Sequence, residues 1–154
     1  MNKSFYGAGV IGVALIAFAF FGASASGQKA EPKKVDHMEH NEMMQACSKA
    51  CSECQRACDT CATHCTHMLQ EGKKDHLATA MACQDCASIC SVSSQIMARG
   101  GPFSDTVCTA CAEACSRCGK ECEKFPDDKH MKQCAEECRK CEKSCRDMLK
   151  HMGK

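Results

Sequence analysis

Small apolar side chains recur every third or fourth position along four stretches of the chain, and the repeating residue in each stretch is Cys. Steps of three and four residues return to the same face of an α-helix, whereas a strand would need a step of two. Lys, Arg, Asp and Glu occupy the positions away from this face. The pattern therefore predicts four amphipathic helices, over residues 36–71, 75–99, 104–124 and 128–152.

Turn-forming residues separate the four stretches. Gly72 and Gly100 follow the first two, as glycine commonly follows a helix, and Phe-Pro-Asp-Asp at 125–128 ends the third. Candidate N-terminal caps precede the three later helices: Asp75, Ser104, and Asp127 or Asp128. Short connections between amphipathic helices favour an all-α fold, an antiparallel up-down four-helix bundle with a Cys-lined core, over residues 36–154.

The first 25 residues have the pattern of an export signal. Lys3 precedes an uncharged apolar run from Gly7 to Gly22, and Ala23-Ser24-Ala25 resembles a cleavage site. Residues 26–35 are short and polar, and we expect a flexible arm there. The sequence thus predicts a periplasmic or secreted protein with no stable membrane insertion after the signal is cleaved.

The composition after residue 25 is unusual for a folded domain. Its 129 residues contain all 18 Cys but only 10 Leu, Ile, Val and Phe in total, so a conventional aliphatic core is excluded. Its 19 Lys and Arg balance its 19 Asp and Glu. This balance argues against nucleic acid or acidic lipid as a partner of the whole chain.

Every Cys falls on the alternation of three-residue and four-residue steps, so each helix presents its thiols as one stripe. Thiolates favour soft metals such as Cu(I) and Zn(II). All eighteen are therefore candidate metal ligands: Cys47, Cys51, Cys54, Cys58, Cys61, Cys65, Cys83, Cys86, Cys90, Cys108, Cys111, Cys115, Cys118, Cys122, Cys134, Cys138, Cys141 and Cys145.

Disulfides and iron–sulfur clusters are other uses of closely spaced thiols. Disulfides within one helix are disfavoured, because Cβ atoms one turn apart lie about 5–6 Å from each other and a disulfide needs about 3.5–4.5 Å. Bridges between helices stay open, so an exported disulfide-stabilised or thiol-redox structural protein is one alternative, and a zinc or soft-metal buffer is another. The C-x3-C-x2-C strings resemble an iron–sulfur motif, but the periodicity alone generates them. No nucleophile with a base and no phosphate-binding loop is present, so we predict no enzyme activity.

Met and His extend the Cys stripes at one end of the predicted bundle. There the start of the first helix lies beside the ends of the second and fourth, and thioether with imidazole suits Cu(I) better than zinc. The candidate residues of this metal-entry mouth are His37, His40 and Met44, together with Met43, Met97, Met148, His151 and Met152. His64, His67 and His130 are expected to be ordinary surface residues near the opposite end.

Charge limits the metal capacity. Two thiolates per ion would give about 9 Cu(I) per chain and leave buried negative charge, whereas bridging thiolates would give about 18 and a neutral core. We therefore expect a capacity between these values, and uptake of the metal should release protons.

These features together, the Cys-lined helices, the Met and His mouth and the export signal, resemble the bacterial four-helix-bundle copper storage proteins over residues 36–152. The resemblance implies storage of many Cu(I) ions on the eighteen Cys, with His37, His40 and Met44 at the mouth. It also implies a homo-oligomer and an unidentified copper donor or recipient protein. Exported members tend to carry a twin-arginine signal, whereas this chain has only Lys3 before its apolar run, which keeps the disulfide alternative open.

Overall fold

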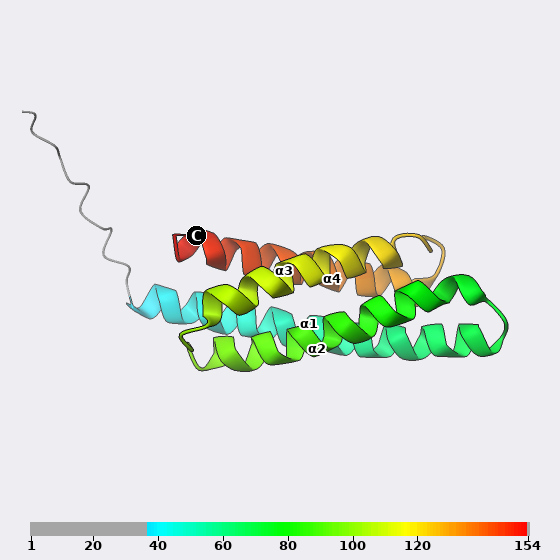
Figure 1. Cartoon of the computed structure of the whole chain (residues 1–154). Coiled ribbons are helices and arrows are strands. Elements are labelled where there is room, and N and C mark those ends of the chain that lie inside the picture. Colours follow the sequence, from blue (N-terminus) through cyan, green and yellow to red (C-terminus); the bar gives the residue numbers. More distant parts are fainter. Residues whose placement is uncertain (1–36, 154) are drawn as a thin grey trace, which may run out of the picture. The chain divides into compact units, whose positions relative to one another are not determined.

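The computed structural model describes residues 37–153, of which His37 is described by its backbone alone. Four α-helices follow one another, with a short 3₁₀ turn, η1, before the second (Figure 1). Their bounds are α1 His37–Gln70, η1 Lys74–His76, α2 Leu77–Ala98, α3 Ser104–Cys122 and α4 Lys129–His151. Each helix lies within the range expected from the sequence. The predicted signal, residues 1–25, and the predicted arm, residues 26–35, lie outside the described residues.

Several of the predicted helix ends have the expected geometry. Gly72 and Gly100 have φ values of 87° and 59°, a left-handed conformation that favours glycine after a helix. Asp128 is the N-cap of α4, and its Oδ1 accepts hydrogen bonds from the backbone N–H groups of His130 and Met131. These residues fix where α1 and α2 end and where α4 begins.

The predicted caps of the two middle helices are wrong. Asp75 lies inside η1, and α2 begins after His76 without a side-chain cap. The carboxylate of Asp75 instead contacts Nδ1 of the buried His76 at 3.0 Å. Ser104 is the first residue of α3 rather than its cap, and its hydroxyl donates to the Gly101 carbonyl at 2.6 Å.

The helices form a ring in which α1 packs beside α2 and α4, and α3 also packs beside α2 and α4. Successive helices run in opposite directions (Figure 1). One end of the bundle, here called the mouth end, therefore holds the start of α1 and α3 and the finish of α2 and α4. The other, the far end, holds η1 and the connection between α3 and α4. The predicted four-helix bundle is confirmed.

The core of the bundle consists of sulfur and small side chains. All eighteen Cys are buried, accompanied by Ala62, Ala80, Ala87, Ala112 and Ala135. The only Met side chains below 2% exposure in the described part of the chain are Met97, Met131 and Met148, and all three lie near the ends of helices. Thiols pack as small hydrophobic groups, so they fill the space that Leu would fill in a common bundle.

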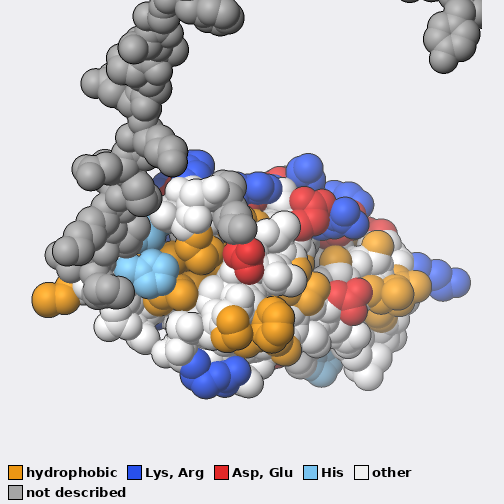
Figure 2. All heavy atoms as spheres, turned by 60° about the vertical axis from the view of Figure 1, so that its left-hand side comes forward, with side chains coloured by type: hydrophobic (Ala, Val, Ile, Leu, Met, Phe, Trp, Pro, Cys, Tyr) orange, Lys and Arg blue, Asp and Glu red, His pale blue; other side chains and the backbone are white. Residues whose placement is uncertain are grey.

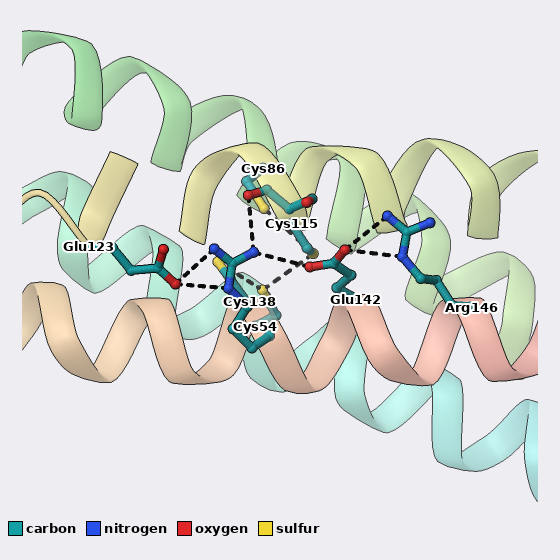
Figure 3. A network of polar contacts seen from close by, with 9 residues as sticks. Cys54, Cys86, Cys115, Glu123, Cys138, Glu142 and Arg146 are labelled. Carbon is teal, nitrogen blue, oxygen red and sulfur yellow. Dashed lines mark hydrogen bonds and ion pairs between the residues drawn. The ribbon is translucent and has the colours of Figure 1, made fainter. Parts of the chain in front are cut away.

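Outside the sulfur core, a polar network joins α3 to α4. The guanidinium of Arg139 donates to Glu123 at 2.8 Å, to Glu142 at 3.1 Å and to the Ser116 carbonyl at 3.2 Å. Glu142 also pairs with Arg146, so that it lies between two guanidinium groups (Figure 3). A Cβ at Gly119 would meet Arg139 Cζ at 3.0 Å. The absence of a side chain at Gly119 lets Arg139 cross α3 at close range.

The outer face of α2 differs from those of the other helices. Asp85 is its single charged residue, and Leu77, Met81 and Val92 are each more than half exposed. Even so, neither α2 nor any other helix among residues 37–153 has a stretch apolar and long enough to cross a membrane.

Candidate metal centre

All eighteen Cys side chains predicted as ligands point into the core and are at most 1% exposed. Each helix contributes its own stripe, because the three-residue and four-residue steps keep the thiols on the inward face. The sequence prediction that these residues come together is therefore correct for every one of them.

The sulfur atoms meet across the axis of the bundle. Four thiols of α1 face four of α3 at Sγ–Sγ distances of 3.7 to 3.9 Å, in the order Cys47–Cys108, Cys51–Cys111, Cys54–Cys115 and Cys58–Cys118. On the other diagonal, Cys83 of α2 meets Cys134 of α4 at 3.9 Å. Contacts across both diagonals show that the core is one continuous column of sulfur.

Groups of four thiols within this column form clusters, here called tetrads, whose sulfur atoms all lie within 4.8 Å of one another. Three of them share no residue: Cys51, Cys111, Cys141 and Cys145, the mouth-side tetrad; Cys54, Cys86, Cys90 and Cys115, the middle tetrad; and Cys58, Cys118, Cys134 and Cys138, the far tetrad. Each tetrad draws on at least three helices. Soft metal ions bound here would therefore tie the helices together.

The thiols differ in acidity. Hydrogen bonds to Cys118 and Cys134, with burial, raise the pKa of Cys58. Contacts with Cys115 and Cys138 lower the pKa of Cys54. Burial, together with the neighbouring Cys61 thiol, raises the pKa of Cys65 to about 12. Since so many close thiolates would repel one another, the metal-free core must hold most of its protons.

Thioether groups close the mouth end of the sulfur column. Met44, Met97 and Met148 are 5%, 0% and 1% exposed, and the Cys108 thiol donates to Met97 Sδ at 3.4 Å. Met43 and Met152 are partly buried against them. The predicted gathering of Met from three helices at this end is therefore present.

Histidines stand beside these thioethers. The rings of His40 and His151 are stacked with their centroids 5.4 Å apart. His151 Nε2 is buried and has no hydrogen-bond partner among the residues that the structure describes. Figure 2, which turns this end forward, shows a histidine side chain next to apolar side chains. His37 begins α1, but its side chain is outside the described part of the chain.

The far end has a different construction. His64 Nε2 lies 2.7 Å from Asp128 Oδ2, and the His64 ring stacks on that of His130 at 4.4 Å. The Cys61 thiol donates to the buried Met131 Sδ at 3.3 Å. The expectation of ordinary surface residues holds for the exposed His67 but is wrong for His64, which is only 18% exposed and fixed by Asp128.

The sequence reasoning missed this pairing because His64 and Asp128 are far apart along the chain. Their contact depends on how far α1 and α4 are shifted along their axes, which the Cys periodicity does not specify. The one available signal was Asp128 itself. A cap uses one carboxylate oxygen for backbone N–H groups and leaves the other oxygen for a neighbour.

Comparisons with known proteins agree with this geometry. The copper storage protein (Csp) family matches residues 40–150. A cytosolic copper storage protein from Streptomyces lividans, solved with five coppers, superimposes with a TM-score of 0.68 at 29% identity, covering 73% of this chain and 97% of that one. Cu(I)-bound copper storage protein BsCsp3 gives 0.63 at 33% identity, covering 70% and 98%.

A curated relative is also rich in Cys. The cysteine-rich protein YhjQ of Bacillus subtilis strain 168, described as uncharacterized, is 37% identical over 87 residues, which are 55% of this chain and 81% of YhjQ. The family match covers most of the chain and includes all eighteen thiols that line the core. The chain therefore belongs to the copper storage protein family.

Proposed function

We propose that this protein stores many Cu(I) ions on the thiolates of its core. The observation that carries the proposal is the continuous column of eighteen buried sulfur atoms, in which neighbours from different helices lie 3.6 to 3.9 Å apart. Two similar proteins of known structure carry copper. The role is storage rather than catalysis, and copper is the cargo.

The ligands in this proposal are the eighteen Cys predicted from the sequence. Each thiol that binds Cu(I) loses its proton, so the charge of the core changes little when the number of ions approaches the number of thiols. A thiolate that bridges two Cu(I) ions leaves no net charge behind, which favours loading from about 9 toward about 18 ions per chain.

Copper enters, in the same proposal, through the mouth end. Met44, Met97 and Met148 supply thioethers directly above the sulfur column, and His40 and His151 supply imidazole beside them. His37 is assigned to this route on its position at the start of α1. The unpartnered Nε2 of His151 supports the route, because a buried nitrogen without a hydrogen bond is ready to accept a ligand.

An anaerobic titration of the metal-free protein with Cu(I) tests the storage function. We expect saturation between about 9 and 18 ions per chain, a rise in unfolding temperature and release of protons. Saturation at one to four ions would contradict the proposal. Thiol counting on protein purified from cells separates it from the disulfide alternative, which predicts few reactive thiols after copper removal instead of nearly 18.

We propose that the protein acts outside the cytoplasm. The support is Lys3, the apolar run and Ala23-Ser24-Ala25, which together fit an export signal. Fractionation of cells with N-terminal sequencing of the exported form would show a chain that begins at Ser26. A full-length protein found only in the cytoplasm would contradict export while leaving copper storage intact.

We further propose that the outer face of α2 pairs with a second copy of the chain. A two-fold interface brings the same surface against itself, so like charges there would repel, and Asp85 is the only charge on α2. The exposed side chains of Leu77, Met81 and Val92 would supply the apolar contacts of this interface.

Light scattering after gel filtration tests this pairing. We expect a dimer or larger assembly that falls to a monomer in Met81→Glu/Val92→Glu, whereas Thr109→Glu on the exposed face of α3 keeps the assembly. A monomeric wild-type protein would contradict the proposal.

A further inference from the structure

The spacing of the sulfur atoms carries information about which metals the empty core accepts. An ion held by four thiolates at about 2.3 Å requires sulfur atoms about 3.8 Å apart. In the mouth-side tetrad, Cys51 lies 3.7 Å from Cys111, 3.7 Å from Cys141 and 3.8 Å from Cys145. Two thiolates on opposite sides of one Cu(I) ion would have to move farther apart than this.

The middle and far tetrads have the same spacing. In the middle tetrad, Cys115 lies 3.7 Å from Cys54, 3.8 Å from Cys86 and 3.6 Å from Cys90. In the far tetrad, Cys58 lies between 3.8 and 3.9 Å from its three partners. In each tetrad of the metal-free core, one sulfur therefore already lies at the tetrahedral spacing from the other three, and all four sulfur atoms lie within 4.8 Å of one another.

We propose that the core has a second binding mode, in which tetrahedral divalent cations such as Zn²⁺ and Cd²⁺ occupy separate tetrads, two tightly and a third more weakly. Two other tetrads overlap these three, so they compete with them for ions: one shares Cys134 with the far tetrad, and the other shares two residues with each of the middle and far tetrads. Their members are Cys61, Cys83, Cys122 and Cys134, and Cys54, Cys58, Cys86 and Cys138. This inference concerns the same thiols as the proposed copper storage, although it does not require that function.

Charge sets the order of filling. Four thiolates around a divalent cation carry a net charge of −2, which is costly in a buried site unless neighbouring groups donate hydrogen bonds. Neutral thiols do so for the mouth-side tetrad: Cys47 contacts Cys145 at 3.7 Å, and Cys90 contacts Cys111 at 3.6 Å. An ion in the middle tetrad would remove Cys90 as a donor.

The middle tetrad also borders the far tetrad, because Cys54 lies 3.9 Å from Cys58 and 3.7 Å from Cys138. An ion there would place its charge beside both neighbours. The mouth-side and far tetrads should therefore fill first and the middle one last, with lower affinity. Cu(I) loading has no such limit, since bridged Cu(I) thiolates approach neutrality.

The test is an anaerobic titration of the full metal-free protein with Cd²⁺, followed by its thiolate-to-metal ultraviolet absorption, and with Zn²⁺, followed by native mass spectrometry. We expect two tightly held ions, a weaker third, and about four protons released per ion. Retention of no ion, or saturation at four or more ions per chain, would overturn the inference.

Substitutions locate the two tight sites. Cys141→Ser removes a member of the mouth-side tetrad. Cys58→Ser/Cys134→Ser removes the far tetrad together with the two tetrads that overlap it, so each of these variants should lower the number of tight ions from two to one. Cys65→Ser, outside these tetrads, is the matched control and should keep two. Equal counts in all three variants, with helicity preserved by circular dichroism, would also overturn it.

A parallel Cu(I) titration of the same sample separates the two ideas. If Cu(I) loads in large number and Cd²⁺ and Zn²⁺ do not bind, the second binding mode is wrong and copper storage stands. If Cd²⁺ and Zn²⁺ bind but Cu(I) saturates at four ions or fewer, copper storage fails and the second mode stands.

Discussion

The two ends of the bundle use the same residue types for different purposes. At the mouth end, Met44, Met97 and Met148 close the sulfur column and His151 Nε2 has no partner in the described chain. At the far end, His64 is held by Asp128, whose other oxygen caps α4. The imidazole of His151 is free to bind a ligand at one end, whereas that of His64 is engaged in the fold at the other.

This difference shows why residue type alone does not identify a metal route. Both ends combine buried Met with a stacked pair of histidines. What distinguishes them is whether the nitrogen that would bind metal already accepts or donates a hydrogen bond. The comparison can be tested by removing Asp128, the partner of His64, at the far end, and by removing the Met thioethers at the mouth end.

The largest effect on stability should come from the far end. Asp128→Ala removes the cap of two backbone N–H groups and the partner of His64, and should destabilise the metal-free protein by about 2 kcal/mol. Urea denaturation measures this. Asp127→Ala, at an exposed neighbour, is the control and should cost less than about 0.5 kcal/mol. The copper uptake rate should stay unchanged, and a slower uptake would show that the far end admits metal.

The mouth end should respond in the opposite way. Met44→Leu/Met97→Leu/Met148→Leu keeps the packing nearly constant but removes the thioethers, so stability should change little while Cu(I) uptake slows about tenfold. Stopped-flow mixing with a Cu(I) complex gives the rate, and Met131→Leu at the far end is the control. Equal slowing by the control would remove the distinction between the ends.

A smaller effect, at Cys65 near the far end, depends on pH. The folded-state pKa of Cys65 is raised from 9.0 to about 12 by burial, so its contribution to stability is complete below pH 9 and is lost as the pH rises toward 12. This thiol should account for roughly 1 kcal/mol of lost stability per pH unit in that window. Denaturation of Cys65→Ala at pH 8 and pH 10 should show a shallower decline than wild type, and an identical slope would refute the assignment.

The sequence was sufficient for the main architecture. The alternating steps place every Cys on an inward face, and the breaks at Gly72, Gly100 and residues 125–128 separate the helices. Up-down topology was then enough to bring Met44, Met97 and Met148 together, because it fixes which helix ends are neighbours. These features depend only on local periodicity and chain order.

Features that depend on axial shifts and on competing turns were not predictable in this way. The 3₁₀ turn η1 forms where a cap by Asp75 was expected, since His76 is buried against the Phe125 ring at a centroid distance of 4.3 Å. The clamp of Arg139 over Gly119 likewise requires a particular spacing of α3 and α4. Both the turn η1 and the position of Arg139 therefore depend on contacts between helices, which the local sequence pattern does not specify.

The sulfur core also constrains how this protein can change. In most bundles, core residues maintain the fold and a separate set of residues performs the function, so mutations in one set leave the other largely intact. In the proposed storage function, the eighteen buried thiols belong to both sets. Loss of any one Cys leaves a poorly filled position in a narrow core and removes a ligand in the same step. Replacement of the thiols by the larger Leu would require all four helices to move apart together. A series of single substitutions therefore cannot convert the sulfur core into an aliphatic one.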